Sequence, residues 1–268
     1  MEDLKLETIA VTRPVEGVVV ATLDRPERYN SMTVTMFAEL EQLAFALGDD
    51  DEARVLILTG AGKAFCAGYD LDDADELAGL TALGMLERQE LAARGLQAIR
   101  SLRIPVIAAV NGAAAGGGLS LALAADIRIA SRSAKFNAAF VRIGLSAGDL
   151  GASWLLPRII GPALASEIAC TGRFVLADEA ERTGLVNKTV DDEALLDEAV
   201  AMAKLIRANS PAGVQVSKRA MQANLEIGSY AAALELENRG QALLTRTEDM
   251  PEALAAFKEK RAPKFTGR

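Results

Sequence analysis

The sequence contains no histidine. This absence excludes Ser-His-Asp and Cys-His nucleophile arrangements and the common zinc sites built from histidine. A general base must therefore be a carboxylate or, less commonly, a lysine, tyrosine or cysteine with a shifted pKa. We expect no metal centre.

Cysteines, long apolar runs and an excess of positive charge are also scarce or absent. Two cysteines, Cys66 and Cys170, are too few for a disulfide framework, which favours a reducing cytoplasm. No apolar run reaches the roughly 18 residues of a membrane helix. The start, MEDLKLETIA, lacks the basic and apolar regions of a signal peptide. The net charge of −8 argues against nucleic-acid binding. We expect a cytoplasmic protein with neither a nucleic-acid nor a membrane partner.

The length of 268 residues, half of them apolar, allows one large domain or a core with an appendage. The composition shifts near residue 195, after which almost every segment has a helical pattern. We therefore expect a core over 1–194 and a helical region over 195–268. Apolar stripes in that region need a partner, for which another subunit is a candidate; they contain Leu234, Leu236, Leu243 and Leu244.

The segment 106–126, VIAAVNGAAAGGGLSLALAAD, is the centre of the pattern. It predicts a buried strand, a tight turn, and a helix that opens at Gly117 or Gly118. Free N–H groups and the positive end of the helix dipole at that point suit an oxyanion. The alternative is that the glycines only permit tight packing. The spacing fits neither a dinucleotide fingerprint nor a phosphate loop.

The pattern of strand, loop and helix recurs along the chain and favours stacked ββα units. A hairpin is expected over 6–12 and 18–23, and a helix over 33–47 with Ser31 as its N-cap. A buried strand is expected over 55–58, then a loop over 61–73 and a long helix over 77–102. Further strands are expected at 127–130, 135–137 and 187–190, and further helices at 150–160, 163–171, 195–208, 211–226, 229–245 and 250–260.

Two loops, AFCAGYDL from Ala64 and NGAAAGGG from Asn111, follow an upstream RPERYN motif. Together with LLPR, TGR, GLV and the tail FKEKRAPKF in this order, the chain resembles the crotonase (enoyl-CoA hydratase/isomerase) superfamily over essentially its whole length. The resemblance implies an α/β fold, the ClpP/crotonase-like spiral of ββα units with a C-terminal helical trimerisation region. It also implies an acyl-CoA substrate, no cofactor beyond the coenzyme A of that substrate, and a trimer or a dimer of trimers.

In this family two backbone N–H groups bind the thioester oxygen and stabilise the enolate. By motif position these resemble the amides of Tyr69 and Gly117. The tyrosine ring can also shape the acyl pocket. The resemblance implies that neighbouring residues line the CoA thioester, namely Ala64, Ala67, Gly68, Asp70, Leu71 and Gly116.

The chain departs from the hydratases of the family at both catalytic glutamates. Ser120 stands at the first position, and Phe140 matches the second. No glutamate occurs between Glu90 and Glu167. Asp126 at a helix-to-strand junction suits a structural role. Asp149 resembles the aspartate with which isomerase-type members move a proton, although it lies one residue further from the preceding glycine. Its alternative role is the N-cap of a helix that starts at Leu150, and both roles are compatible.

An acidic protein needs local cations to bind the phosphates of CoA. The resemblance places Arg25 and Arg28 near the nucleotide, with Lys63 beside the AFCAG loop. The basic tail of Lys260, Arg261 and Lys264 is a candidate for a neighbouring subunit's CoA. For each of these side chains the alternative is an ordinary solvated charge.

Three functions compete. The first is an acyl-CoA enzyme of isomerase type that uses Asp149, with Ser120 able to hold a water. The second is an acyl-CoA-binding protein that has lost its chemistry, as the absent glutamates suggest. The third, a serine hydrolase using Ser120, lacks a histidine to activate the hydroxyl.

Overall fold

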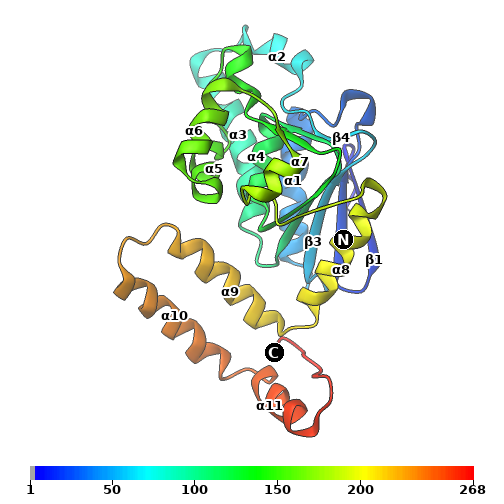
Figure 1. The fold of residues 1–268 in the computed structure, drawn as a ribbon, viewed down its shortest axis with the longest axis vertical. Coiled ribbons are helices and arrows are strands. Elements are labelled where there is room, and N and C mark those ends of the chain that lie inside the picture. The colour runs from blue at the N-terminus through cyan, green and yellow to red at the C-terminus, as the bar shows by residue number, and fades with distance from the viewer. Residues whose placement is uncertain (1–3) are drawn as a thin grey trace.

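The computed structural model describes residues 4–268, without the side chains of Ala74 and Asp75. Met1–Asp3, the start of the expected core, lie outside the described residues. Two sheets form the body of the molecule, and helices surround them (Figure 1).

The larger sheet has the strand order β1-β2-β3-β5-β7-β10. Its strands are β1 Ile9–Val15, β2 Val18–Leu23, β3 Val55–Gly60, β5 Val106–Val110, β7 Ile127–Ser131 and β10 Lys188–Val190. Only β1 and β2 pair antiparallel, so the expected hairpin is confirmed. The central strands consist mostly of apolar residues because both faces of a parallel sheet are covered.

Alternate residues of these strands enter two separate hydrophobic cores. Leu56 and Leu58 of β3 face the larger core, into which α1, α3 and α4 also pack. Val55 and Ile57 of the same strand face a smaller core. One strand therefore holds helices on both faces of the sheet.

The smaller sheet has the order β4-β6-β8-β9. Its strands are β4 Ala64–Cys66, β6 Ala113–Ala115, β8 Lys135–Asn137 and β9 Val175–Leu176. The pairs β3 and β4, β5 and β6, and β7 and β8 each give one strand to either sheet, which is the expected ββα repeat. Our loop over 61–73 and our tight turn after Asn111 were wrong in part, because β4 and β6 lie there. Strands of three residues, here rich in alanine, are too short and too weak in propensity to leave a sequence pattern.

Most helices begin and end near the expected residues, but the short helices α2 and α7 were not expected. They are α1 Val34–Gly48, α2 Leu71–Leu77, α3 Ala82–Arg100, α4 Gly117–Ala124, α5 Ala152–Ile160, α6 Pro162–Thr171, α7 Ala177–Arg182, α8 Leu195–Arg207, α9 Pro211–Asn224, α10 Tyr230–Leu244 and α11 Asp249–Glu259, with short 3₁₀ turns at Pro26–Arg28, Ala139–Ile143 and Asp192–Ala194.

Two expected helix starts were wrong. The N-cap of α1 is Thr33, whose hydroxyl accepts from the Met36 N–H, whereas the Ser31 hydroxyl binds a carboxylate further along the chain. The helix expected over 77–102 begins only at Ala82, where Thr81 is its N-cap, and Leu77 is the last residue of a separate helix, α2.

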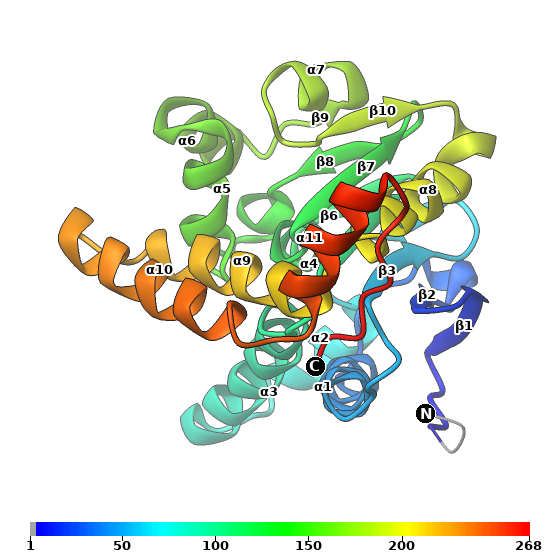
Figure 2. The same ribbon diagram turned by 90° about the horizontal axis from the view of Figure 1, so that it is seen from below.

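The helical region that we expect from residue 195 divides into two parts. Leu195, Ala199 and Ala203 of α8 cover the smaller core on the face of the large sheet (Figure 2). The helices α9 and α10 extend from the body side by side, with α11 beyond them (Figure 1). A boundary drawn by packing therefore falls after α8, and the boundary at residue 195 stays a prediction.

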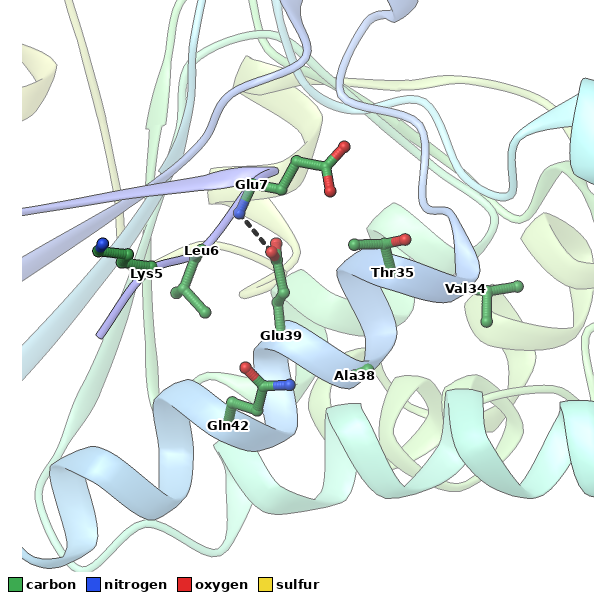
Figure 3. A pocket seen from close by; sticks show the side chains of 8 residues that line it. All are labelled: Lys5, Leu6, Glu7, Val34, Thr35, Ala38, Glu39 and Gln42. Carbon is green, nitrogen blue, oxygen red and sulfur yellow. Dashed lines mark hydrogen bonds between the residues drawn. The ribbon is translucent and has the colours of Figure 1, made fainter. Parts of the chain in front are cut away.

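A surface groove of about 610 Å³ lies between the N-terminal segment and α1 (Figure 3). At its base the buried carboxylate of Glu39 accepts from the amides of Glu7 and Thr8, and from the Thr8 hydroxyl at 2.5 Å. Glu39 thus attaches the segment before β1 to α1. None of the residues that we expect at a site lines this groove.

Over residues 4–268, no helix combines the length and the apolar character needed to cross a bilayer.

Candidate active site

The three glycines at the start of α4 have different roles. Gly116 has a φ of +52°, a backbone conformation that side-chain-bearing residues rarely adopt. A Cβ on Gly118 would lie 2.1 Å from the Cys66 carbonyl oxygen, so α4 can pack against β4 only with glycine there. The tight-packing alternative is therefore correct for Gly118. Helix α4 begins at Gly117, as expected.

The loop around Tyr69 is attached to Met32 by a short parallel bridge. The Met32 N–H donates to the Gly68 carbonyl at 2.7 Å, and the Asp70 N–H donates to the Met32 carbonyl at 2.9 Å. In this pairing the N–H of the central residue, Tyr69, points away from its partner strand. A Cβ built on Gly68 would lie 3.7 Å from the Gly117 nitrogen, so the Tyr69 loop approaches the first turn of α4.

Neither the Tyr69 N–H nor the Gly117 N–H donates a backbone hydrogen bond within residues 4–268. The Gly117 N–H is one of the groups at a helix start that have no partner inside the helix, and it lies at the positive end of the dipole. The Tyr69 ring stacks on Phe37 with centroids 6.1 Å apart, and its hydroxyl accepts from Arg88 at 3.3 Å. The loop is therefore held by side chains that leave its amide available.

Asp149 lies on the segment before α5, against the first turns of α4. Its carbonyl lies 3.5 Å from the Ser120 hydroxyl, and a Cβ on Gly117 would be 3.3 Å from Leu150 Cδ1. The expected N-cap role was wrong: α5 begins at Ala152 after Gly151, with no side-chain cap. The half-buried Asp149 carboxylate instead accepts from the side-chain amide of Gln89 on α3. Burial raises the pKa of this carboxyl group, although the hydrogen bonds from Gln89 and the Leu150 N–H oppose the shift.

Ser120 and Phe140, which we expect at the two hydratase glutamate positions, are both buried. Ser120 is fully buried, and its hydroxyl lies 3.5 Å from the Gly116 carbonyl. The Phe140 ring lies 3.9 Å from where a Cβ of Gly116 would be. A buried hydroxyl on α4 and an apolar ring beside its start therefore occupy this region.

Asp70 is the centre of an ion-pair cluster. Its buried carboxylate accepts from Arg25 and the Ser31 hydroxyl, both at 2.8 Å, and from Arg28 at 3.2 Å. Burial alone would raise the pKa of Asp70, but these hydrogen bonds and that from the Asp72 N–H hold it far below its ordinary value. Arg25 and Arg28, expected near the nucleotide, are therefore engaged with the Tyr69 loop, and their contact with CoA stays a prediction.

The other expected binding residues are distributed as follows. The Ala64 carbonyl accepts from Asn30 at 2.8 Å and from Asn111 at 3.2 Å, which fixes the start of the loop. Ala67 and Leu71 are exposed on either side of Tyr69. Lys260 lies after α11, at the end of the molecule opposite α2 (Figure 1), so the fold does not bring it to the site of its own chain.

The structure also brings residues to this region that the sequence analysis missed. Arg88 of α3 contacts the Tyr69 loop and Gln89 of α3 contacts Asp149, while Asn30 and Asn111 both donate to the Ala64 carbonyl at the start of β4. Of these residues, only the two asparagines could have been predicted from the sequence, since both lie in motifs that carry the family resemblance. Asp126 has a structural role: its carboxylate accepts from the Val106 N–H at 2.8 Å.

The sequence profile of the enoyl-CoA hydratase/isomerase family matches residues 13–268. The chain belongs to this family. A probable enoyl-CoA hydratase of Mycobacterium bovis is 43% identical over 96% of the chain and 92% of the relative. The 1,2-epoxyphenylacetyl-CoA isomerase of Escherichia coli is 42% identical over 94% of the chain and 96% of the relative.

Solved structures of the family share the fold. A crystal structure of an enoyl-CoA hydratase described as putative, from Streptomyces coelicolor, has a TM-score of 0.94 at 37% identity, covering 98% of this chain and 96% of that one. A probable enoyl-CoA hydratase/isomerase from Mycobacterium abscessus has a TM-score of 0.90 at 41% identity, covering 98% and 100%. The expected crotonase-like α/β fold is confirmed. Membership of the enoyl-CoA hydratase/isomerase family supports an enzyme that acts on CoA thioesters.

Proposed function

We propose that the protein moves a proton on an acyl-CoA thioester, using the amides of Tyr69 and Gly117 to hold the thioester oxygen and Asp149 as the only catalytic carboxylate. The reaction class is double-bond isomerisation rather than hydration. The observation that supports it most directly is the approach of the Tyr69 loop to the first turn of α4, where both amides are unused and Asp149 is adjacent.

The two amides supply the stabilisation that the reaction needs. Removing a proton next to a thioester carbonyl places negative charge on the carbonyl oxygen. Two N–H donors and a helix start stabilise that charge, and one such donor typically contributes about 2.7–4 kcal/mol in the transition state. Because the donors belong to the backbone, replacing the Tyr69 side chain would leave its N–H in place.

Asp149 carries the proton. Its carboxylate takes a proton from the carbon next to the carbonyl, and the electrons of that C–H bond form the enolate. The protonated carboxyl group then returns the proton at the other end of the conjugated system, so the double bond moves and the atoms balance. A carboxyl group whose pKa is raised by burial exchanges protons more readily near neutral pH.

Hydration is less favoured because family hydratases position the attacking water with two glutamates. Here Ser120 and Phe140 stand at those positions, and both are buried. The names of the relatives do not decide this preference, since the one from Escherichia coli is an epoxyphenylacetyl-CoA isomerase and the one from Mycobacterium bovis is a probable enoyl-CoA hydratase. The same substitutions support the alternative function, an acyl-CoA-binding protein with little or no turnover.

The Asp149→Asn variant tests the proposal on enoyl-, 3-enoyl- and dienoyl-CoA substrates. We expect isomerisation to fall by about 10²–10⁴-fold, the usual contribution of a general acid–base group. Burial disfavours the ionised carboxylate in the fold, so the thermal midpoint at neutral pH should be unchanged or slightly higher. Asp197→Asn, at an exposed position of α8, is the matched control and should turn over normally.

The outcomes separate the candidate functions. Normal turnover by Asp149→Asn would remove Asp149 from the mechanism. CoA binding by the unmodified protein without turnover of any of the three substrates would favour the binding protein instead.

We also propose a trimer, or a dimer of trimers, in which α9–α11 contact a neighbouring subunit and Lys260 reaches that subunit's CoA. The support is that α10 has no buried side chain within its own chain. Fatty-acid or related acyl-CoA metabolism in the cytoplasm is the setting that we propose. The free cysteines Cys66 and Cys170 agree with that compartment.

A further inference from the structure

Helix α3 contacts the Tyr69 loop and the segment that carries Asp149 through two successive residues. Arg88 donates to the Tyr69 hydroxyl at 3.3 Å and forms an ion pair with Glu76 at 3.7 Å. Gln89, the next residue, donates from its side-chain amide to Oδ1 of Asp149. One turn of α3 therefore connects the loop with the oxyanion amide to the segment with the proton-transfer carboxylate.

Gln89 has a particular relation to that carboxylate. Within residues 4–268 it is the one side chain that donates a hydrogen bond to the Asp149 carboxylate. A glutamine amide donates without adding a charge, and an N–H donor favours the ionised, basic form of a carboxyl group. It also restricts the orientation of the two oxygens, because one of them is engaged.

We propose that Gln89 is a positioning residue for the reaction described above, holding the Asp149 carboxylate ionised and oriented toward the acyl chain. This role rests on the proposed function, since it acts only through Asp149.

The charged side chains near Asp149 in the described structure are engaged elsewhere or exposed, so the neutral amide of Gln89 is the group that holds the Asp149 carboxylate. Helix α4, packed beside it, carries no ionisable side chain. On α3, Arg88 is engaged with Tyr69 and Glu76, while Glu87 and Glu90 are exposed. The cations of the flanking elements lie on aromatic rings, Arg142 over Phe174 and Arg158 over Trp154. No ion pair involving Asp149 occurs among the described residues.

The test is the pH dependence of kcat/KM for isomerisation in Gln89→Leu. Removing the donor should raise the pKa of Asp149, so the base form is lost at a higher pH. We expect the acidic limb to move up by about one pH unit, the equivalent of one hydrogen bond to a charged group, and kcat to fall by roughly tenfold. Gln89→Glu adds a like charge and should move the limb further in the same direction.

Gln97→Leu is the matched control, because Gln97 is also an exposed glutamine of α3 and donates no side-chain hydrogen bond in the described chain. Its pH profile should equal that of the unmodified protein. Thermal midpoints of all variants separate this effect from a loss of fold.

An unmoved acidic limb in Gln89→Leu, with Asp149→Asn inactive, would overturn the role of Gln89 and leave the proposed function intact. Full turnover by Asp149→Asn would overturn the role of Asp149 and that of Gln89 with it.

Discussion

At the scale of single residues, two aspartates of the site region are in opposite electrostatic environments. Burial raises the pKa of Asp149, which has one neutral side-chain donor. Asp70 is more deeply buried, yet its pKa is lowered because two arginines and Ser31 donate to it. The first environment suits a group that exchanges protons, and the second suits a fixed charge that holds a loop.

Asp70→Asn should therefore lower the free energy of unfolding by about 3–5 kcal/mol at pH 7, since it leaves Arg25 in a partly buried position without its charge partner. The sign of the pH dependence follows from the lowered pKa. The carboxylate's contribution to the free energy of unfolding is fully present above the ordinary aspartate pKa of about 3.9. It is lost as the pH falls below that value. Urea unfolding at pH 7 measures the loss on substitution. Urea unfolding at about pH 2.5 should show a smaller difference between the two proteins, because the folded pKa of Asp70 lies far below its ordinary value.

Asp72→Asn is the control for that change. Asp72 also pairs with Arg28, but its side chain is 78% exposed, and such a pair contributes less than about 1 kcal/mol. Equal losses in the two variants would contradict the structural role of Asp70.

At the scale of elements, the two ends of α4 differ in their hydrogen-bond partners. At its C-terminal end the buried guanidinium of Arg128 donates to the Ala125 carbonyl at 2.7 Å and to the Leu185 carbonyl at 2.7 Å. These bonds satisfy a helix-end carbonyl and fix the segment before β10. At its N-terminal end the Gly117 N–H donates no backbone hydrogen bond within residues 4–268, which leaves the positive end of the helix for a ligand.

Helix α9 is attached to the core by a buried lysine. Lys218 forms an ion pair with Asp126 at 2.7 Å and donates to the Ile104 carbonyl at 2.9 Å, while Gln222 donates to the other oxygen of Asp126 at 3.1 Å. Burial lowers the pKa of Lys218, and the Asp126 carboxylate opposes that shift.

Lys218→Met should therefore loosen the attachment of α9. We expect a loss of about 3–5 kcal/mol in the free energy of unfolding, because one partner of a buried pair is removed. Limited proteolysis should also cut faster in the segment 208–210, between α8 and α9. Lys204→Met, at an exposed position of α8, is the control and should behave like the unmodified protein. Unchanged cleavage in Lys218→Met would show that other contacts hold α9.

At the scale of the whole molecule, the helices α9–α11 expose several large apolar side chains. Met221 is 73% exposed and Phe257 is 84% exposed, and α10 buries none of its fifteen residues. Helices gain most of their stability by packing an apolar face, so these helices require a partner surface. A second and a third copy of the chain supply it in the proposed trimer.

Phe257→Glu, combined with Met221→Glu, should shift the assembly toward monomers, which light scattering coupled to size-exclusion chromatography measures. Phe45→Glu is the matched control: Phe45 is 67% exposed but lies on α1 of the core, so the mass should not change. A monomeric mass for the unmodified protein would contradict the proposed assembly.

The sequence alone determined the strands of the large sheet, most helices and the family. These depend on local patterns: buried parallel strands appear as apolar runs, amphipathic helices show their period, and the loops around Tyr69 and Gly117 carry short motifs. The absence of histidine and of glutamate between Glu90 and Glu167 led to the prediction of a single catalytic aspartate in the same way.

The tertiary structure decided which side chains meet. Arg25 and Asp70 are 45 residues apart in the sequence, and Gln89 and Asp149 are 60 apart. No local pattern encodes such pairs, because they form only when separate elements pack together. The strands β4 and β6 also depend on contacts between distant segments, since a strand of three residues is stable only when it pairs with another strand. Local burial therefore specified the elements, whereas contacts between distant elements specified the candidate site.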